Sequence, residues 1–137
     1  MIIIAAVDDR NGMMFNRRRQ SQDRVLRQRI LDLSSVSRLW VNHYTQKQFA
    51  DANAPQLNAD ENFLSEATSG EYCFVENVSV APYEKWVEKI ILFKWNRKYP
   101  GDQFFDIDVM GNGWCLESTE DFPGSSHEKI TMEVYTR

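Results

Sequence analysis

The sequence predicts an α/β fold of three layers, in which helices flank a mostly parallel, mixed sheet that ends in an antiparallel hairpin. Residues 1–7 form an apolar run that the turn formers of residues 8–12 close. Such a run is typical of a central strand buried on both faces, beneath helices. Near the C-terminus apolar and polar residues alternate instead, as they do in half-exposed antiparallel strands.

Length and composition set the frame for this fold. The 137 residues fit a single domain, residues 1–137, whose core is large enough to need no disulfide or metal. The net charge of −4 points to no partner and leaves room for a local basic site. Cys73 and Cys115 lie far apart in apolar stretches, which predicts two buried, reduced thiols and no metal site. No leader and no membrane-length apolar segment is visible, so we expect a cytoplasmic protein.

The first half of the chain predicts three helices and one more strand. Ser21 is a suitable cap for a helix whose apolar stripe is Leu26, Ile30 and Leu33. Residues 39–41 predict a second buried strand, after which Thr45 is expected to cap another helix. Residues 51–60 have the composition of a loop, with Asp60 as the cap of a short helix that ends at Gly70.

The second half predicts more strands than helices. Residues 72–75 and 89–96 are expected to be buried strands, and Pro82 suits the first turn of a short helix between them. The alternating segments 105–109 and 129–135, with residues 114–118 between them, predict half-exposed strands.

Arginine is concentrated in one segment, because six arginines lie between residues 17 and 29. The planar guanidinium suits phosphate or carboxylate, although a solvated helix face explains the same pattern. Phe15 beside these arginines could stack on a base. The more ordinary interpretation places it in the core, together with Met13, Met14, Trp40 and Trp86.

The order of these elements is similar to the dihydrofolate reductase fold, and local motifs support the resemblance over most of the chain. That family opens with an apolar strand ending in Ala-Val-Asp, followed by a glycine and a mobile loop with a methionine. Here the pattern reads Ala6-Val7-Asp8, Gly12, Met14 and Phe15. Later matches are residues 89–92, the Gly101-Asp102 loop and the Ser126-His127 turn before the last strand. The resemblance implies that the Gly101-Asp102 loop packs on the methionine loop.

The resemblance implies a substrate-binding acid at the start of the first helix. If Leu26 and Arg27 fill the places that follow the acid, Gln22 stands where the acid belongs, and glutamine cannot ionise. If Asp23 is the acid, Arg27 replaces the apolar group that packs on the pterin ring. Phe93 stands where a family threonine hydrogen-bonds the acid.

The resemblance also implies NADPH as the cofactor, but its phosphate-binding motifs are eroded. The turn that grips the phosphates is matched by residues 42–45, which contain His43 and keep only Thr45. The Gly-Gly turn that lets a pyrophosphate approach is matched by Glu76-Asn77-Val78, where side chains and a negative charge occupy the space.

We therefore expect a divergent dihydrofolate reductase-like domain that does not perform standard dihydrofolate reduction. It would bind a small anionic or heteroaromatic ligand, or a partner protein, through an arginine-rich cleft. One alternative is a nicotinamide-dependent reductase of a pterin-like or other small substrate, with Asp23 as a proton-relaying acid whose pKa burial raises. Another is a weak nucleic-acid-binding module. The expected ligand-binding residues are Val7, Asp8, Met14, Phe15, Arg17, Arg18, Arg19, Gln22, Arg27, His43, Thr45 and Phe93. Because residues 17–19 precede the helix, their replacement by alanine should leave the fold intact.

Overall fold

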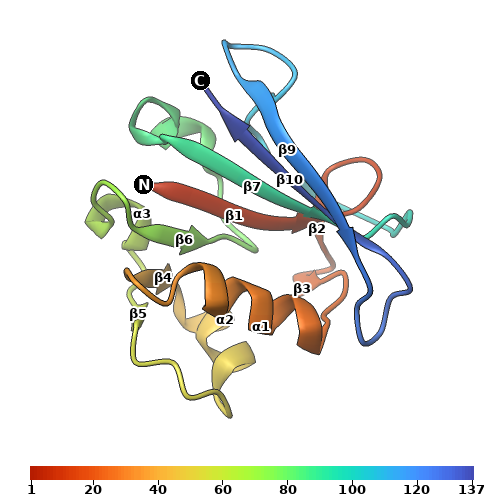
Figure 1. Ribbon diagram of the computed structural model, residues 1–137, viewed down its shortest axis with the longest axis horizontal. Coiled ribbons are helices and arrows are strands. Elements are labelled where there is room, and N and C mark those ends of the chain that lie inside the picture. The colour runs from red at the N-terminus through yellow and green to blue at the C-terminus, as the bar shows by residue number, and fades with distance from the viewer.

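The computed structural model describes residues 1–137 and contains a seven-stranded main sheet (Figure 1). The strand order across the sheet is β5-β4-β6-β1-β7-β10-β9. The first five strands in this order, from β5 across to β7, pair in parallel. Strand β10 runs antiparallel to both of its neighbours, β7 and β9. The predicted mixed sheet with a C-terminal antiparallel hairpin is therefore confirmed. The strands are β1 Ile2–Val7, β4 Leu39–Val41, β5 Leu57–Ala59, β6 Tyr72–Phe74, β7 Lys89–Lys94, β9 Cys115–Phe122 and β10 Ile130–Thr136.

Strand β1 is apolar throughout because each of its faces meets a different hydrophobic core. Ile3, Ala5 and Val7 belong to one buried cluster, and Ile2 and Ile4 belong to the other. Since successive side chains of a strand point to opposite faces, only an unbroken apolar run can satisfy both layers. The prediction for the opening of the chain is confirmed.

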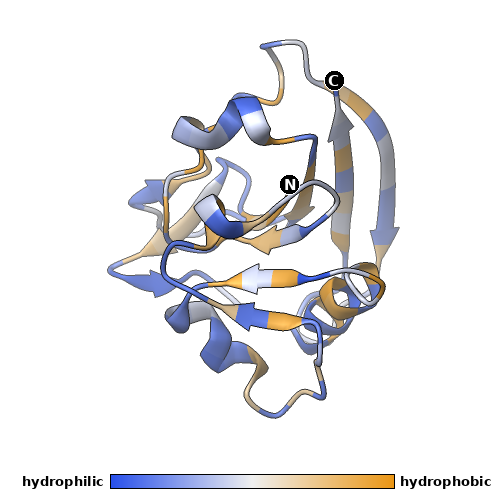
Figure 2. Ribbon diagram, turned by 90° about the vertical axis from the view of Figure 1, so that its left-hand side faces the viewer, coloured by the Kyte–Doolittle hydropathy of each residue, from blue (hydrophilic) through white to orange (hydrophobic).

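Short helices cover the sheet. They are α1 Arg24–Leu33, α2 His43–Gln46 and α3 Phe63–Glu66, with the 3₁₀ helices η1 Lys47–Phe49 and η2 Ala81–Trp86. Helix α1 packs Leu26 and Ile30 into the second core cluster. None of these helices is long and apolar enough to cross a membrane. Figure 2 shows hydrophobic residues along the inner strands, whereas β10 alternates between hydrophobic and hydrophilic residues.

Three helix caps differ from the prediction. The N-cap of α3 is Asn62 rather than Asp60, and this helix ends at Glu66, before Gly70. Helix α1 is capped by Asp23 rather than Ser21, because the Asp23 carboxylate accepts hydrogen bonds from the backbone N–H groups of Val25 and Leu26. Helix α2 is capped by Asn42, whose side chain accepts from the N–H of Thr45. Thr45 itself is fully buried inside the helix.

A small second sheet replaces the exposed loop that the sequence predicted after β1. Its strands are β2 Gly12–Phe15, β3 Arg18–Arg19 and β8 Gln103–Phe104, in the order β3-β2-β8. The pairing holds because Met13 and Met14 are buried, so this segment packs on the core. The sheet lies beyond the carboxyl end of β1 (Figure 1).

Two further segments differ from the predicted strands and loops. Residues 105–109 form no strand, although Phe105, Ile107 and Val109 are buried in alternation with exposed residues. The Asp106 carboxylate between them instead binds the backbone N–H groups of Val80 and Ala81, which anchors the segment as a loop. Conversely, residues 57–59 inside the predicted loop pair in parallel with β4 as β5.

Three side chains expected in the core are exposed. Phe15 is 47% exposed and Trp86 is 57% exposed. Cys115 is exposed because it lies on the edge strand β9, whose residues other than Phe122 all face solvent, whereas Cys73 is buried as expected.

Candidate functional site

The β2–β3 hairpin presents the arginines that the sequence singled out. Phe15 and Arg18 face each other across the hairpin, and Asn16 and Arg17 form the two-residue turn between them. Both turn residues have positive φ, 51° and 63°, which is the geometry of a type I′ turn and is uncommon for arginine. Arg17 and Arg18 are exposed, and neither side chain makes a hydrogen bond or ion pair within the protein.

A cavity of about 290 Å³ lies between this hairpin and the loop that follows β7. We call it the arginine-rich cleft, and its walls are Phe15, Asn16, Arg18, Arg19, Gln20, Tyr99 and Pro100. The Asp102 carboxylate accepts from the Asn16 N–H at 3.0 Å, and the Asp102 N–H donates to the Met14 carbonyl at 2.9 Å. The Gly101-Asp102 loop therefore packs on the methionine segment, as the resemblance implied.

Asp8 fixes the floor beneath the cleft. Its buried carboxylate accepts from the backbone N–H groups of Gly12 at 2.7 Å, Arg10 at 2.8 Å and Tyr99 at 3.2 Å, and from Gln20 Nε2 at 3.1 Å. Burial opposes its charge, but these hydrogen bonds outweigh burial and hold the pKa of Asp8 below its usual range. Oε1 of Gln20 is buried with no hydrogen-bond partner.

Arg19 is committed to an internal ion pair. Its Nε and Nη2 donate to the two carboxylate oxygens of Glu76 at 2.8 and 3.1 Å, and its guanidinium lies 4.5 Å from the ring centroid of Tyr44. Thr45 Oγ1 and Gln48 Nε2 also donate to Glu76, at 2.8 and 2.9 Å. Burial lowers the pKa of Arg19, yet Glu76 outweighs that effect and raises it above the usual value. The Glu76 carboxylate thus accepts hydrogen bonds from Arg19, Thr45 and Gln48.

Asp23 also has its carboxylate surrounded by donors. Besides capping α1, it accepts from the backbone N–H groups of Ser125 at 3.1 Å and Ser126 at 2.7 Å, and from the Ser126 hydroxyl at 2.9 Å. Burial favours the neutral acid, but the hydrogen bonds outweigh it and hold the pKa of Asp23 well below its usual range. The expectation of a raised pKa is therefore wrong, because it considered burial without the donors.

His127 links Asp23 to the wall of the cleft. Its Nδ1 lies 3.4 Å from the Asp23 carboxylate, and its Nε2 lies 2.9 Å from the hydroxyl of Tyr99 and 3.3 Å from that of Ser21. The imidazole stacks on Trp95 with the ring centroids 4.4 Å apart. The start of α1, the β7–β8 loop and the β9–β10 turn are therefore held together.

The remaining predicted site residues do not gather at the cleft. Val7, Met14, Thr45 and Phe93 are buried in the core with at most 2% of their surface exposed. Gln22 and His43 are exposed, and Arg27 is half-buried with Nη1 3.4 Å from Gln22 Oε1. His43 lies beside Glu61, with its Nδ1 3.2 Å from the carboxylate. Of the predicted residues, Phe15, Arg18 and Arg19 line the cleft together, with Arg17 on the adjoining turn.

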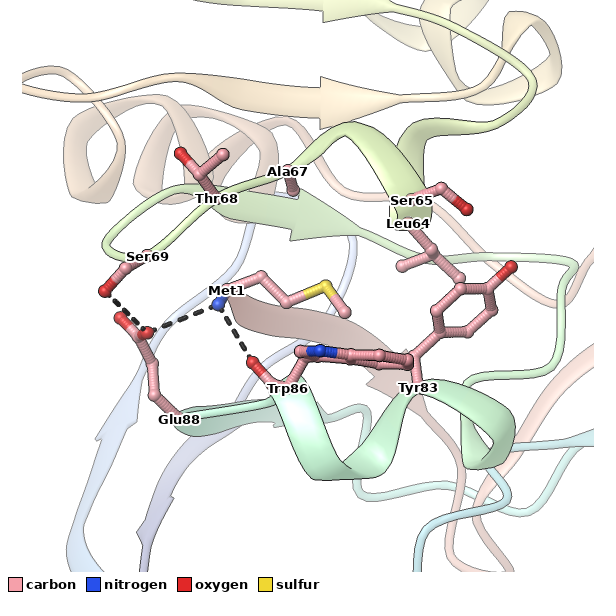
Figure 3. A pocket seen from close by; sticks show the side chains of 9 residues that line it. All are labelled: Met1, Leu64, Ser65, Ala67, Thr68, Ser69, Tyr83, Trp86 and Glu88. Atoms are coloured by element: carbon pink, nitrogen blue, oxygen red, sulfur yellow. Dashed lines mark hydrogen bonds and ion pairs between the residues drawn. The ribbon is translucent and has the colours of Figure 1, made fainter.

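Sequence reasoning missed Asn16, Gln20, Tyr99 and Pro100 as walls of the cleft. A signal for Tyr99 and Pro100 was present, because they directly precede the Gly101-Asp102 loop that already suggested contact with the methionine segment. Gln20 follows the arginine run and carries no motif of its own. A second cavity, at the opposite end of β1, was also missed (Figure 3).

No protein-family model and no curated protein matches the sequence. The structure nevertheless matches dihydrofolate reductase from Enterococcus faecalis, solved in complex with NADP(H) and RAB-propyl. The TM-score is 0.69 at 14% sequence identity, over 100% of this chain and 96% of that chain. The protein has the dihydrofolate reductase-like fold. At this level of identity the match establishes the fold alone.

Within the reductase-like fold, the residues that stand at the expected phosphate positions do not fit a dinucleotide. The resemblance places the cofactor phosphates beside Thr45 and the turn at Glu76. Here the Glu76 carboxylate is 8% exposed and already accepts hydrogen bonds from Arg19, Thr45 and Gln48. A phosphate brought to this place would face a buried negative charge and would have to displace an internal ion pair.

Proposed function

We propose that this chain is a ligand-binding domain with a reductase-like fold, which lacks standard dihydrofolate reduction. Its ligand is a small anionic or heteroaromatic molecule held in the arginine-rich cleft. One observation carries the proposal: the exposed ring of Phe15 and the unpaired guanidinium of Arg18 stand opposite each other and line one cavity. An aromatic face binds a flat ring and a guanidinium binds phosphate or carboxylate, so the pair suits a molecule with both.

The charge distribution around the cleft supports an anion rather than a cation. Arg17 and Arg18 carry free guanidinium groups at the rim. The two buried carboxylates nearby, Asp8 and Glu76, are already surrounded by hydrogen-bond donors from the protein. The exposed charges at the rim are then the two guanidinium groups and the carboxylate of Asp102, which accepts from the Asn16 N–H, and their sum is positive.

The lack of dihydrofolate reduction rests on three positions to which the resemblance assigns a role, those of the acid, of its threonine partner and of the phosphate-binding turn. Asp23 is held ionised by its hydrogen-bond donors, which is the wrong protonation state for an acid that delivers a proton near neutral pH. Phe93 and Thr45 are buried in the core. Titration with NADPH, followed by energy transfer from the protein's tryptophans, tests this part of the proposal. Saturable binding below millimolar concentration would favour the reductase alternative.

A thermal-shift screen of nucleotides, pterins and polyanions tests ligand binding. We expect stabilisation by at least one anionic or heteroaromatic class, and a loss of that stabilisation in the Arg17→Ala/Arg18→Ala variant. Stabilisation by no class would contradict a small-molecule role and leave a partner protein as the occupant to test. Nucleic acid is distinguished by salt, because log K falls by about 0.7 to 0.9 per phosphate contact for each log unit of salt.

A further inference from the structure

A second cavity, of about 500 Å³, lies at the amino end of β1, opposite to the arginine-rich cleft (Figure 3). Leu64 in α3 and the segment that follows it to Ser69 form one wall, and Tyr83 and Trp86 of η2 form the other. The side chain of Met1 lies between the two walls. The volume is within the range of roughly 300 to 1,000 Å³ that is typical of small-molecule sites.

The η2 wall of the cavity exposes aromatic side chains to solvent. Trp86 is 57% exposed, and η2 contributes no buried residue to the core. The ring centroids of Tyr83 and Trp86 are 6.3 Å apart with the planes tilted by 47°, so the two rings form a bent aromatic surface. Such a surface favours a flat partner, because aromatic rings attract one another in offset and tilted arrangements.

The polar groups of this cavity favour an uncharged ligand. Glu88 is the one charged side chain among the lining residues, and its carboxylate lies 3.3 Å from the N-terminal ammonium of Met1, which lines the same cavity. It also accepts from the Gly70 N–H at 2.8 Å and the Ser69 hydroxyl at 3.1 Å. These two opposite charges cancel, so the lining carries no net charge to attract a charged ligand. The hydroxyls of Ser65 and Tyr83 make no hydrogen bond within the protein and can bind a polar substituent.

We propose that this cavity binds an uncharged, mono- or bicyclic aromatic molecule, which packs on Trp86 and Tyr83 and hydrogen-bonds to the free hydroxyls. The site is separate from the arginine-rich cleft and prefers a different charge. A failure of binding at one site would therefore not count against the other.

Titration with 2-naphthol, followed by ¹H–¹⁵N NMR, tests the site. Among the four tryptophan indole signals, we expect a saturable shift of the Trp86 signal, while that of the buried Trp95, which stacks on His127, stays in place. The backbone amides of residues 64–69 should shift with the same affinity. The anionic analogue 2-naphthoate should bind about tenfold more weakly, because its carboxylate loses hydration in a cavity whose lining carries no net charge.

Two variants locate the binding. Trp86→Leu should weaken 2-naphthol binding about tenfold by removing the exposed indole. Ala67→Phe, which keeps the indole, should weaken it by filling the cavity. Phe104→Leu is the matched control, since Phe104 is also an exposed aromatic residue, 47% exposed, but lies on β8. The proposal is overturned if Trp86 shows no saturable shift, if neither cavity variant weakens binding, or if 2-naphthoate binds more tightly than 2-naphthol.

Discussion

Arg19 and Glu76 are joined by two hydrogen bonds, of 2.8 and 3.1 Å, between β3 and the segment after β6. The resemblance to reductases places cofactor phosphate near Glu76, so the carboxylate occupies the neighbourhood in which an anionic ligand would otherwise be held. Thr45, which the resemblance assigns to phosphate binding, donates to this carboxylate instead. Arg19 and Thr45 therefore both bind Glu76 within the protein.

The first prediction concerns this ion pair. Glu76→Gln should lower the free energy of unfolding by about 1 to 3 kcal/mol, because Arg19 and its neighbours lose the charged acceptor that satisfies them. The matched control is Glu120→Gln, whose carboxylate also pairs with an arginine at 2.8 Å but has 51% of its side chain exposed. It should cost at most about 1 kcal/mol. Equal costs in urea denaturation would contradict a structural role for Glu76.

The second prediction concerns pH. Because the folded-state pKa of Asp23 lies below that of the unfolded chain, its contribution to stability is fully present above the unfolded value of about 3.9. That contribution is lost as the pH falls further toward the folded-state pKa. Asp23→Asn should therefore be destabilised by about 1 to 3 kcal/mol at pH 7, with the difference narrowing below about pH 4. An amide nitrogen at this place would oppose the two donors of Ser126.

Denaturation curves at pH 7, 5 and 3 measure this effect. Asp9→Asn is the control, since Asp9 is an exposed carboxylate in the neighbouring loop. An Asp23→Asn variant as stable as the parent at pH 7 would show that the hydrogen bonds from residues 125 and 126 contribute nothing net.

The third prediction concerns the hairpin turn. Arg17 has a φ of 63°, a conformation that costs an L side chain about 1 to 2 kcal/mol and that glycine adopts freely. Arg17→Gly should therefore stabilise the fold by up to about 1 kcal/mol in thermal or urea unfolding. Asn16→Gly should change stability less, because asparagine tolerates this region. Destabilisation by Arg17→Gly would mean that the side chain makes a contact the fold requires.

The fourth prediction concerns the two cysteines. Burial raises the pKa of the Cys73 thiol to about 12, so at pH 8 it should not react with a thiol reagent while the protein is folded. The exposed Cys115 should react in the native state. We expect one thiol to be labelled without denaturant and none in Cys115→Ser. Labelling of two thiols in the folded protein would contradict the placement of Cys73.

Much of the fold was predictable because β1 and β10 carry different burial patterns in their residues. In an α/β sheet an unbroken apolar run indicates a strand buried on both faces, whereas alternation of apolar and polar residues indicates a half-exposed strand. Short elements were less predictable. The two-residue strand β3 is held by pairing with β2 rather than by its own sequence, and residues 105–109 alternate in burial without pairing as a strand.

The candidate site was predictable only in part, because contacts between segments far apart in the sequence determine which side chains are free to bind a ligand. The sequence identified the arginines but gave no sign that Arg19 is bound to Glu76, 57 residues away. The expectation that residues 17–19 can all be replaced by alanine stays a prediction, and the ion pair of Arg19 with Glu76 makes Arg19 the replacement that should cost the most stability. The placement of Asp23 depended equally on the turn at Ser125 and Ser126.

The fifth prediction tests the central claim, that the cleft combines the ring of Phe15 with the guanidinium of Arg18. Isothermal titration with adenosine monophosphate, adenosine and inorganic phosphate compares a ligand that has both features with ligands that have one. The nucleotide should bind about tenfold or more tightly than either part. Arg18→Ala should reduce its affinity to that of adenosine, and Phe15→Ala should weaken both ring-bearing ligands while leaving phosphate unchanged. Equal affinity for adenosine and its monophosphate, or a nucleotide affinity that Arg18→Ala leaves intact, would contradict the account.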